Sequence, residues 1–239
     1  MEKLRGPVNL STNHECGLLI DGFEDPPSVN MIHNPKYYRN LLEGEGFEKS
    51  TDLYAWEVDH KNRFAERMQK RSERLKTNAN IRFRTINMKD FKNEVDRALE
   101  IYNDAWEANW GFVPLQNEEF HHLAQDFKLV LDPNMVLFVQ VDGEDAAFSL
   151  ALPDVNQVLK HNKSGKLFPT GLGKLLWGLK GPMRKRYINR CRIAALGVKK
   201  KYLHLGLGAL LYMEYLKRGP KFGYPPVSYT HLTLPTIGC

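Results

Sequence analysis

The chain has 239 residues, of which 42% are hydrophobic, and it carries a formal net charge of +6. This length and composition are enough to bury one or two ordinary hydrophobic cores. No apolar run reaches the length of a signal peptide or a membrane span, and Cys16, Cys191 and Cys239 show neither a disulfide framework nor metal-ligand spacing. We therefore expect a cytoplasmic protein without a bound metal.

Residues 1–60 alternate rapidly between short elements. Asn34-Pro35 is typical of a helix cap followed by proline at the first helical position, and the apolar residues within 38–42 then form one helical face. Gly44 ends this helix, and residues 53–58 have strand-forming composition. The sequence therefore predicts a short capped helix followed by a strand.

A charged segment separates this first part from a longer unit. Residues 61–80 are dense in Lys and Arg with few apolar residues, which is typical of an exposed connecting helix. Beyond it, the periodicity predicts a strand, two helices, two strands joined by a hairpin, a further strand and a last helix. These elements are expected at 81–86, 95–106, 120–131, 135–141, 146–152, 193–198 and 207–215.

Two motifs in this unit have more than one interpretation. Residues 109–114 connect the two predicted helices, and their aromatic side chains either shape a substrate pocket or plug the core beneath the loop. His121 and His122 are adjacent, so on a helix they point to different faces and cannot form a simple metal pair. We expect these histidines to lie on the surface.

The positive charge is concentrated in one segment. Residues 155–213 contain no Asp or Glu, whereas Lys and Arg occur there 13 times. Such a field attracts anionic ligands, for example a phosphate-bearing cofactor, nucleic acid or an acidic membrane surface. A solvated basic face without a partner explains the same charges nearly as well, and no sequence motif adds a strong nucleic-acid signal.

Within this basic segment, residues 172–186 alternate leucines and Trp177 with Lys and Arg. A basic amphipathic helix of this kind can contact a membrane surface. It can also pack on a sheet with its lysines outward, since helices of globular proteins share the pattern, and this is the interpretation we favour. Several glycines in the stretch weaken it as one continuous helix.

The most informative motif joins the strand ending at Val198 to the last helix. Three lysines follow the strand, and Gly206 and Gly208 lie at the start of the helix. A helix N-terminus offers unpaired backbone N–H groups and a partial positive charge, so it can hold a phosphate. Glycine lets a ligand approach the backbone closely. The loop therefore predicts a phosphate-binding turn.

The register of this loop resembles the acetyl-CoA loop of the GNAT N-acetyltransferase superfamily, commonly V-x-P-x-Y-R-G-x-G-x-G. Four positions match, namely Val198, Tyr202, Gly206 and Gly208. Lys200 replaces the usual proline, Leu203 the usual Arg or Gln, and His204 a glycine whose amide normally faces the pyrophosphate. The resemblance implies that acetyl-CoA or another acyl-CoA binds here as a substrate.

The resemblance also implies which residues hold this substrate. The pyrophosphate would lie against the amides of 203–209, and the edge of the strand at Val198 would hydrogen-bond the pantetheine arm. The implied binding residues are Leu196, Val198, Leu203, His204, Leu205, Gly206, Gly208 and Ala209. The superfamily often places a carboxylate base on the strand leading into Val198, and none occurs in this sequence, so no catalytic residue is assigned.

A second resemblance lies in the first part of the chain. Residues 37–48 are similar to the back half of a GNAT domain, where a helix ends in L-Y-E-x-x-G-F and a strand follows. Leu42 occupies the position where many members place a tyrosine that protonates the departing thiolate. Because leucine cannot donate a proton, that role is excluded here, and the neighbours Tyr37 and Tyr38 are either substitutes or ordinary packing residues.

Together these resemblances imply an organisation in two incomplete copies. Residues 1–60 resemble the C-terminal arm of a first GNAT-like domain, and residues 81–226 resemble the N-terminal part of a second. The stretches at 5–11 and 109–114 are similar to those of a tandem-GNAT family. The expected fold is α/β, with an incomplete GNAT-type mixed, mainly antiparallel sheet flanked by helices. The two arms are complementary, so we expect that they could pack together as one permuted domain.

The two ends of the chain are expected to be truncated. Residues 227–239 begin with a run that matches one translated frame of a common sequencing adapter, so we interpret them as an adapter-derived artefact. The chain also enters what reads as a strand directly at its start. We therefore expect a fragment of a longer protein.

The function implied by the resemblance is acyl transfer from CoA to an amine, performed by the parent protein and absent from the fragment. The alternative is a non-catalytic module that binds acyl-CoA, a membrane surface or another anionic partner. Replacement of the catalytic tyrosine by Leu42 and the altered loop at Leu203 and His204 favour this alternative for at least one copy. The acceptor amine stays unassigned.

Overall fold

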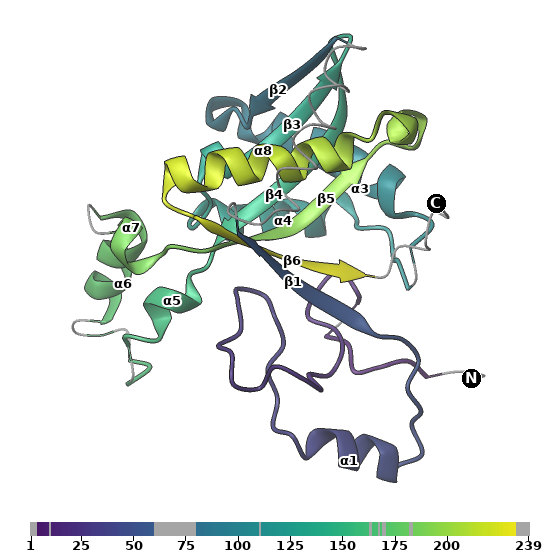
Figure 1. The fold of residues 1–239 in the computed structure, drawn as a ribbon, viewed down its shortest axis with the longest axis vertical. Coiled ribbons are helices and arrows are strands. Elements are labelled where there is room, and N and C mark those ends of the chain that lie inside the picture. The colour runs from purple at the N-terminus through teal and green to yellow at the C-terminus, as the bar shows by residue number, and fades with distance from the viewer. Residues whose placement is uncertain are drawn as a thin grey trace.

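In the computed structural model, the described residues are 4–9, 11–59, 80–109, 111–162, 164–166, 168, 171–181 and 184–232. They form one six-stranded sheet flanked by helices (Figure 1). The connecting helix predicted at 61–80 lies outside the described residues, apart from residue 80.

Within the described residues, the predicted helices and strands occur in the predicted order. The elements are α1 (Tyr38–Gly44), β1 (Leu53–Asp59), β2 (Ile81–Thr85), α3 (Phe91–Trp106), α4 (Asn117–Lys128), β3 (Val136–Val141), β4 (Glu144–Pro153), α5 (Asn156–Leu159), α6 (Gly171–Lys180), α7 (Arg184–Tyr187), β5 (Cys191–Val198), α8 (Leu207–Phe222) and β6 (Pro226–Leu232). Of these, α5 and β6 are additional elements that the sequence analysis does not predict. Short 3-10 turns lie at Met88–Asp90, Pro133–Met135 and Lys200–Leu205.

The sheet is mixed and mainly antiparallel, as the sequence predicts. Its strand order is β1-β6-β5-β4-β3-β2, and only β5 and β6 run parallel. A parallel pair needs a long crossover connection, which α8 provides. The β3–β4 hairpin turns at Asp142 and Gly143, both with positive φ, as the Asp-Gly signal predicts.

Both faces of the sheet are covered. Figure 1 shows α8 crossing one face, with α3 and α4 on the other. On the α8 side, Leu137 and Val139 belong to one buried cluster with Leu207 and Leu211. On the α3 side, Phe138 belongs to a second cluster with Val95 and Ile101 of α3. Because successive strand side chains point to opposite faces, a strand between two helical layers is buried at nearly every position. That explains the almost unbroken apolar run of β3.

The N-terminal segment contributes an edge strand to the same sheet. β1 pairs with β6, and β6 lies between β1 and β5, so the two arms share one sheet. β6 includes residues 227–232, which the sequence analysis interprets as adapter-derived, and residues 233–239 lie outside the described part. Strand pairing uses backbone N–H and carbonyl groups, which nearly every residue carries. The position of β6 therefore depends mainly on where α8 ends and less on which side chains follow it.

Polar contacts fasten the N-terminal segment near the end of β4. The buried Asp154 carboxylate accepts a hydrogen bond from the Val29 backbone N–H at 3.0 Å and two from the Arg190 guanidinium at 3.0 and 2.7 Å. Arg192 donates to the carbonyls of Val29 and Asn30 at 3.0 and 3.1 Å. One buried carboxylate therefore connects the N-terminal segment to β5.

A second set of contacts fastens residues 12–14 to α3 and to the loop that follows it. The Asn13 side chain donates to the Val113 carbonyl and accepts from the Tyr102 hydroxyl, both at 2.8 Å. The Thr12 hydroxyl donates to the Gly111 carbonyl at 2.8 Å. These contacts hold residues 109–114 against the N-terminal segment.

One predicted detail of the N-terminal segment is wrong. Asn34 was expected to cap a helix, but its side chain instead bonds both backbone groups of Leu19, at 2.7 and 3.3 Å. α1 begins later, at Tyr38, without a side-chain cap. Asn34 can act this way because a side-chain amide both donates and accepts, so it can bond the N–H and the carbonyl of one distant residue as readily as a helix end.

We predict that Asp154→Asn lowers the free energy of unfolding by about 3 kcal/mol, because it leaves a partly buried guanidinium without its anion. Urea denaturation followed by circular dichroism measures the change. Glu57→Gln is the matched control, since the half-exposed Glu57 carboxylate lies 3.5 Å from the same Arg190. Its expected cost is below about 1 kcal/mol. Equal effects of the two substitutions would contradict this account of the anchor.

Candidate functional site

The parallel strands β5 and β6 separate partway along β5. Their pairing covers only Cys191–Ile193, which face Val227–Tyr229. β5 continues to Val198, so its last five residues have no strand partner on that edge within the described part of the chain. The sheet therefore opens at this point.

A β-bulge lies where the opening begins. In the pairing of β4 with β5, Leu150 faces Ala195 and Ala151 faces Ile193, so Ala194 is the extra residue. The extra residue of a bulge is left out of the strand ladder, and bulges re-aim the backbone next to functional sites. The Ala194 backbone is thus displaced from regular pairing with β4 and lies beyond the last β6 pair.

The end of α3 forms a wall of this opening. The Trp106 indole N–H donates to the Leu196 carbonyl at 3.0 Å, and its ring stacks on Tyr102 with centroids 5.0 Å apart. A Cβ added at Gly197 would lie 3.0 Å from the Ala105 Cβ, so α3 packs directly on β5. The carbonyl of Leu196, one of the predicted binding residues, is therefore bonded to Trp106 here.

The predicted phosphate-binding turn is more ordered than the sequence suggests. Residues 200–205 form a 3-10 turn, and Gly206 follows with a left-handed φ of 64°. The Gly206 carbonyl accepts hydrogen bonds from the N–H groups of Ala209 and Leu210, at 3.1 and 3.3 Å. Only glycine adopts this φ without strain, and it lets α8 begin at Leu207 immediately after the 3-10 turn.

The start of α8 lies against the end of β5. A Cβ added at Gly208 would be 3.7 Å from the Leu196 side chain and 4.0 Å from the Val198 side chain. The structure thus brings together five of the eight predicted binding residues, namely Leu196, Val198, Gly206, Gly208 and Ala209. Leu203 and His204 are exposed on the 3-10 turn, and Leu205 is half-buried beneath it.

The three lysines of the loop are paired with carboxylates. Lys199 donates to Glu100 at 2.6 Å, Lys200 is bonded to Glu107, and Lys201 donates to Glu144 at 2.7 Å. The Lys200 backbone N–H also donates to the Asp104 carboxylate at 2.6 Å. The positive charge expected to serve a ligand is therefore largely compensated within the protein.

Glu144, in the β3–β4 hairpin, is the centre of one of these ion-pair clusters. Hydrogen bonds from the Lys201 ammonium and then from the Tyr202 hydroxyl, at 2.7 and 2.9 Å, lower the pKa of Glu144 to about 2. A second lysine, Lys199, lies 3.4 Å from the same carboxylate. The Glu144 carboxylate therefore stays charged, and its ion pair with Lys201 persists, at any pH above this low pKa.

Of the two interpretations of residues 109–114, Phe112 fits packing against the core, because its ring centroid lies 6.0 Å from that of the buried Tyr102. Burial raises the pKa of Tyr102, so its hydroxyl stays protonated and donates to Asn13. Trp110, the other aromatic residue of this stretch, lies outside the described residues.

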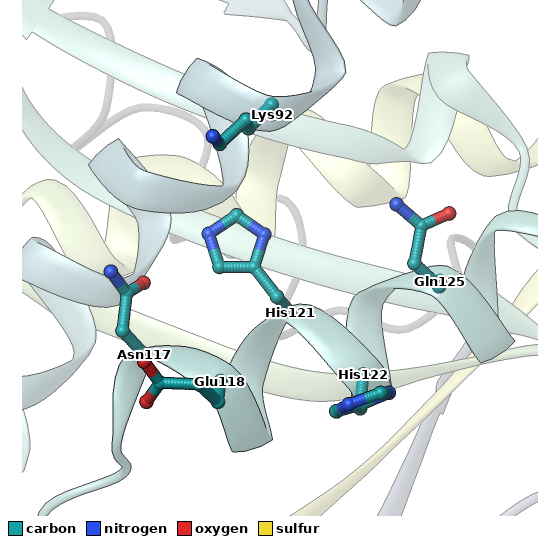
Figure 2. Close-up of a pocket in the computed structure, with 6 residues that line it drawn as sticks. All are labelled: Lys92, Asn117, Glu118, His121, His122 and Gln125. Atoms are coloured by element: carbon teal, nitrogen blue, oxygen red, sulfur yellow. The ribbon is translucent and has the colours of Figure 1, made fainter.

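A separate hollow of about 360 Å³ lies between α4 and the start of α3. It is lined by Lys92, Asn117, Glu118, His121, His122 and Gln125 (Figure 2). Figure 2 shows His121 directed toward α3 and His122 turned another way, as their adjacency predicts. His121 lies 2.7 Å from the Asp96 carboxylate, and the described residues contain no cluster of three metal-ligating groups. This hollow lies at the opposite end of α3 from the glycine turn.

The tyrosines considered as substitutes for a catalytic acid lie elsewhere. Tyr37 and Tyr38 contact each other edge to face at 5.1 Å, and both are exposed at the start of α1. Figure 1 shows α1 far from α8 and from the end of β5. Neither tyrosine, nor Leu42 beside them, is therefore part of the opening between β5 and β6.

Several residues of this site were missed by the sequence analysis. Glu100, Asp104 and Glu107 recur at positions i, i+4 and i+7 of α3, which places them on one helical face. That spacing next to a lysine run is a readable signal. The contact of Trp106 with Leu196 has no comparable signal, because it joins residues 90 positions apart.

No family model matches the chain. It is 40% identical over 206 residues to a protein of Caulobacter vibrioides (strain NA1000 / CB15N) named "Bacterial ceramide synthase", covering 86% of this chain and 52% of that protein. It is 33% identical over 219 residues to "Protein YghO" of Escherichia coli (strain K12), covering 90% and 54%. The chain thus spans about half the length of the curated relatives it matches.

Among solved structures, the chain is similar to a "GCN5-related N-Acetyltransferase" from Sphaerobacter thermophilus. The TM-score is 0.51 with 12% sequence identity, and the match covers 89% of this chain and 51% of that chain. At this identity the likeness concerns the fold. The chain therefore has a GNAT-type fold.

Proposed function

We propose that the whole protein is an acyl-CoA-dependent N-acyltransferase. One observation carries this proposal: β5 and β6 separate after Ile193, so that a bulge at Ala194 and a glycine turn at Gly206 lie at opposite ends of one open strand edge. An extended molecule with a phosphate group at one end and a reactive group at the other suits that arrangement. The names of the Caulobacter and Sphaerobacter proteins, a ceramide synthase and an N-acetyltransferase, support it.

Each part of the acyl-CoA would meet a different part of this edge. The pyrophosphate would lie at the first turn of α8, where Leu207 and Gly208 present the N–H groups that begin a helix. The pantetheine arm would extend along β5 from Val198 toward Ala194. The thioester carbonyl would then reach the bulge, where a backbone N–H outside the ladder can donate to a developing oxyanion.

The reaction would form a C–N bond to the acceptor amine and break the C–S bond to CoA. An alkylammonium has a pKa of about 10, so it must lose a proton before it can attack. Ile193–Val198 carry no ionisable side chain, so the base would come from another element or from solvent. That first proton leaves to the base or to solvent. The nitrogen loses a second proton once the C–N bond has formed, and this proton neutralises the departing thiolate, so the products are the amide, the free thiol of CoA and one released proton.

The acceptor is proposed from the relative's name. Ceramide is an amide of a fatty acid and a long-chain amino alcohol, so a ceramide synthase supports a long-chain amine as acceptor and a fatty acyl-CoA as donor. Acetyl-CoA is the alternative donor. The pairing of Lys199, Lys200 and Lys201 with carboxylates favours recognition of phosphate by backbone N–H groups over recognition by free lysines.

A non-catalytic acyl-CoA-binding module is the second candidate, favoured by the lack of an ionisable side chain at residues 193–198 of β5. One experiment separates the two. The whole protein is incubated with acetyl-CoA and palmitoyl-CoA and with short- and long-chain amines, while free thiol and amide product are measured. Equal amounts of thiol and amide support the enzyme. Tight binding without thiol release would leave the binding module, and no binding at millimolar acyl-CoA would overturn both.

We predict that Gly208→Ala weakens acyl-CoA binding without weakening the fold. A Cβ at Gly208 makes only ordinary contacts, and alanine favours a helix over glycine by up to about 1 kcal/mol. The same methyl group crowds the approach to the first amides of α8, so we expect affinity to fall about tenfold. Calorimetric titration and thermal unfolding measure the two effects. Gly173→Ala, an open position in α6, is the control and leaves affinity unchanged.

We predict that Lys201→Met raises the pKa of Glu144 from about 2 toward the ordinary glutamate range. A lowered pKa means that the ion pair stabilises the fold above the ordinary range and loses this effect as the pH falls toward 2. A ¹³C NMR titration of the carboxylates measures it. Lys200→Met is the control, because Lys200 pairs with Glu107 and its loss leaves Glu144 unchanged. An ordinary Glu144 pKa in the unmodified protein would refute this description of the hairpin.

A further inference from the structure

Three short helices form a group at one end of the molecule. α5, α6 and α7 lie between β4 and β5 in the sequence, and Figure 1 shows them together, away from the glycine turn. The basic apolar stretch 172–186 forms two of them, α6 and α7, rather than one helix. The glycines noted in the sequence agree with this break, which lies at Gly181.

One face of α6 is fixed against the protein. A Cβ added at Gly178 would lie 2.6 Å from a methyl carbon of the buried Val158, so α6 packs closely on α5. Leu179 packs against the main core. This face sets the orientation of the helix and therefore determines what the other face presents.

The opposite face of α6 is apolar and exposed. Gly173, Leu176, Trp177 and Lys180 are all exposed and follow the spacing i, i+3, i+4, i+7 of one helical face. Leu176 is 51% and Trp177 57% exposed. Phe168, before α6, is 75% exposed, and Leu159, at the end of α5, is 45% exposed. A group of large apolar side chains of this kind marks an interaction surface.

Four described cations in and beside α5, α6 and α7 lack a carboxylate partner in the part of the chain that the structure describes. Lys160, Lys166, Lys180 and Arg186 are exposed, and within the described part of the chain none of the four forms an ion pair. The lysines of the glycine turn, by contrast, are all paired with carboxylates. Since residues 155–213 contain no Asp or Glu, the segment itself supplies no counter-charge.

We propose that this surface, defined by Leu159, Phe168, Leu176 and Trp177 with Lys160 and Lys180, docks on the surface of an anionic lipid bilayer. Apolar side chains with a ring of cations match acyl chains beneath acidic headgroups, and tryptophan favours that interface. A groove on a protein would contact the apolar residues, but it would not account for the four cations that have no ion-pair partner among the described residues. α6 has ten residues, about 15 Å, so it lies in the interface and does not cross it.

The position of this surface gives the docking a use. α7 ends at Tyr187 and β5 begins at Cys191, so the surface lies at the opposite end of β5 from Gly206. A long-chain amine or fatty acyl group held in the bilayer would reach the opening from that end. This link rests on the proposed function, whereas the docking itself does not.

Vesicle sedimentation tests the docking. The chain is mixed with vesicles of phosphatidylcholine alone, or with about one third phosphatidylglycerol, and the pelleted fraction is measured. We expect binding only to the anionic vesicles, weakened about tenfold by Trp177→Ala and similarly by Leu176→Ser. Trp56→Ala is the matched control, since Trp56 is equally exposed, at 53%, but lies on β1, and it leaves binding unchanged. Equal loss with Trp56→Ala, or no pelleting at all, would overturn the proposal.

A charge-reversal pair tests the electrostatic part. Lys180→Glu with Arg186→Glu should abolish the preference for anionic vesicles, whereas Lys36→Glu with Lys49→Glu changes the net charge equally and leaves the preference intact. Equal effects would reduce the proposal to general charge attraction and overturn the assigned surface. Gly208→Ala should still bind vesicles and Trp177→Ala should still bind acyl-CoA, so failure of the docking and failure of the proposed function are distinguishable. Concentration-dependent dimerisation lost in Trp177→Ala, without vesicle binding, would instead assign the face to a second copy.

Discussion

The site depends on how β5 is paired along its two edges. On one edge β5 pairs with β4 from Cys191 to Val198, and on the other its pairing with β6 ends after three residues. Sheets twist, so two parallel strands diverge unless hydrogen bonds hold them, and the bulge at Ala194 adds to the local twist. The divergence leaves an open strand edge, with the displaced Ala194 backbone near its beginning and the start of α8 beyond its end.

The basic segment of the sequence divides into two parts with different roles. In the glycine turn, the three consecutive lysines form ion pairs with Glu100, Glu107 and Glu144. These ion pairs attach the loop to α3 and to the β3–β4 hairpin. Around α6, Lys160, Lys166, Lys180 and Arg186 have no ion-pair partner among the described residues, and they accompany exposed apolar side chains. A net charge counted along the sequence cannot make this distinction, because the compensating carboxylates come from other elements.

The sequence predicts the order and type of the main elements because each has a strong local signal. The helical periodicity of α3, the alternation of β2 and the Asp-Gly turn of the hairpin depend only on neighbouring residues. Local signals fail where a partner is distant. Asn34 looks like a cap and instead bonds Leu19, and the glycine loop looks open although its lysines meet a helix about 100 residues earlier. The binding residues were grouped by resemblance, and their roles stay predictions.

The attachment of the N-terminal segment has a consequence during synthesis. The residues that anchor it lie far ahead in the sequence. Thr12 bonds a residue 99 positions later, and Val29 bonds Asp154, 125 positions later, and Arg192, 163 positions later. A ribosome adds about 5–20 residues per second, so the segment is out of reach of its last anchor for roughly ten to thirty seconds. Contacts of such sequence separation also slow folding itself. This segment leaves the ribosome before its partners do, so its backbone and side-chain anchors wait, exposed, until the later part of the chain has been made.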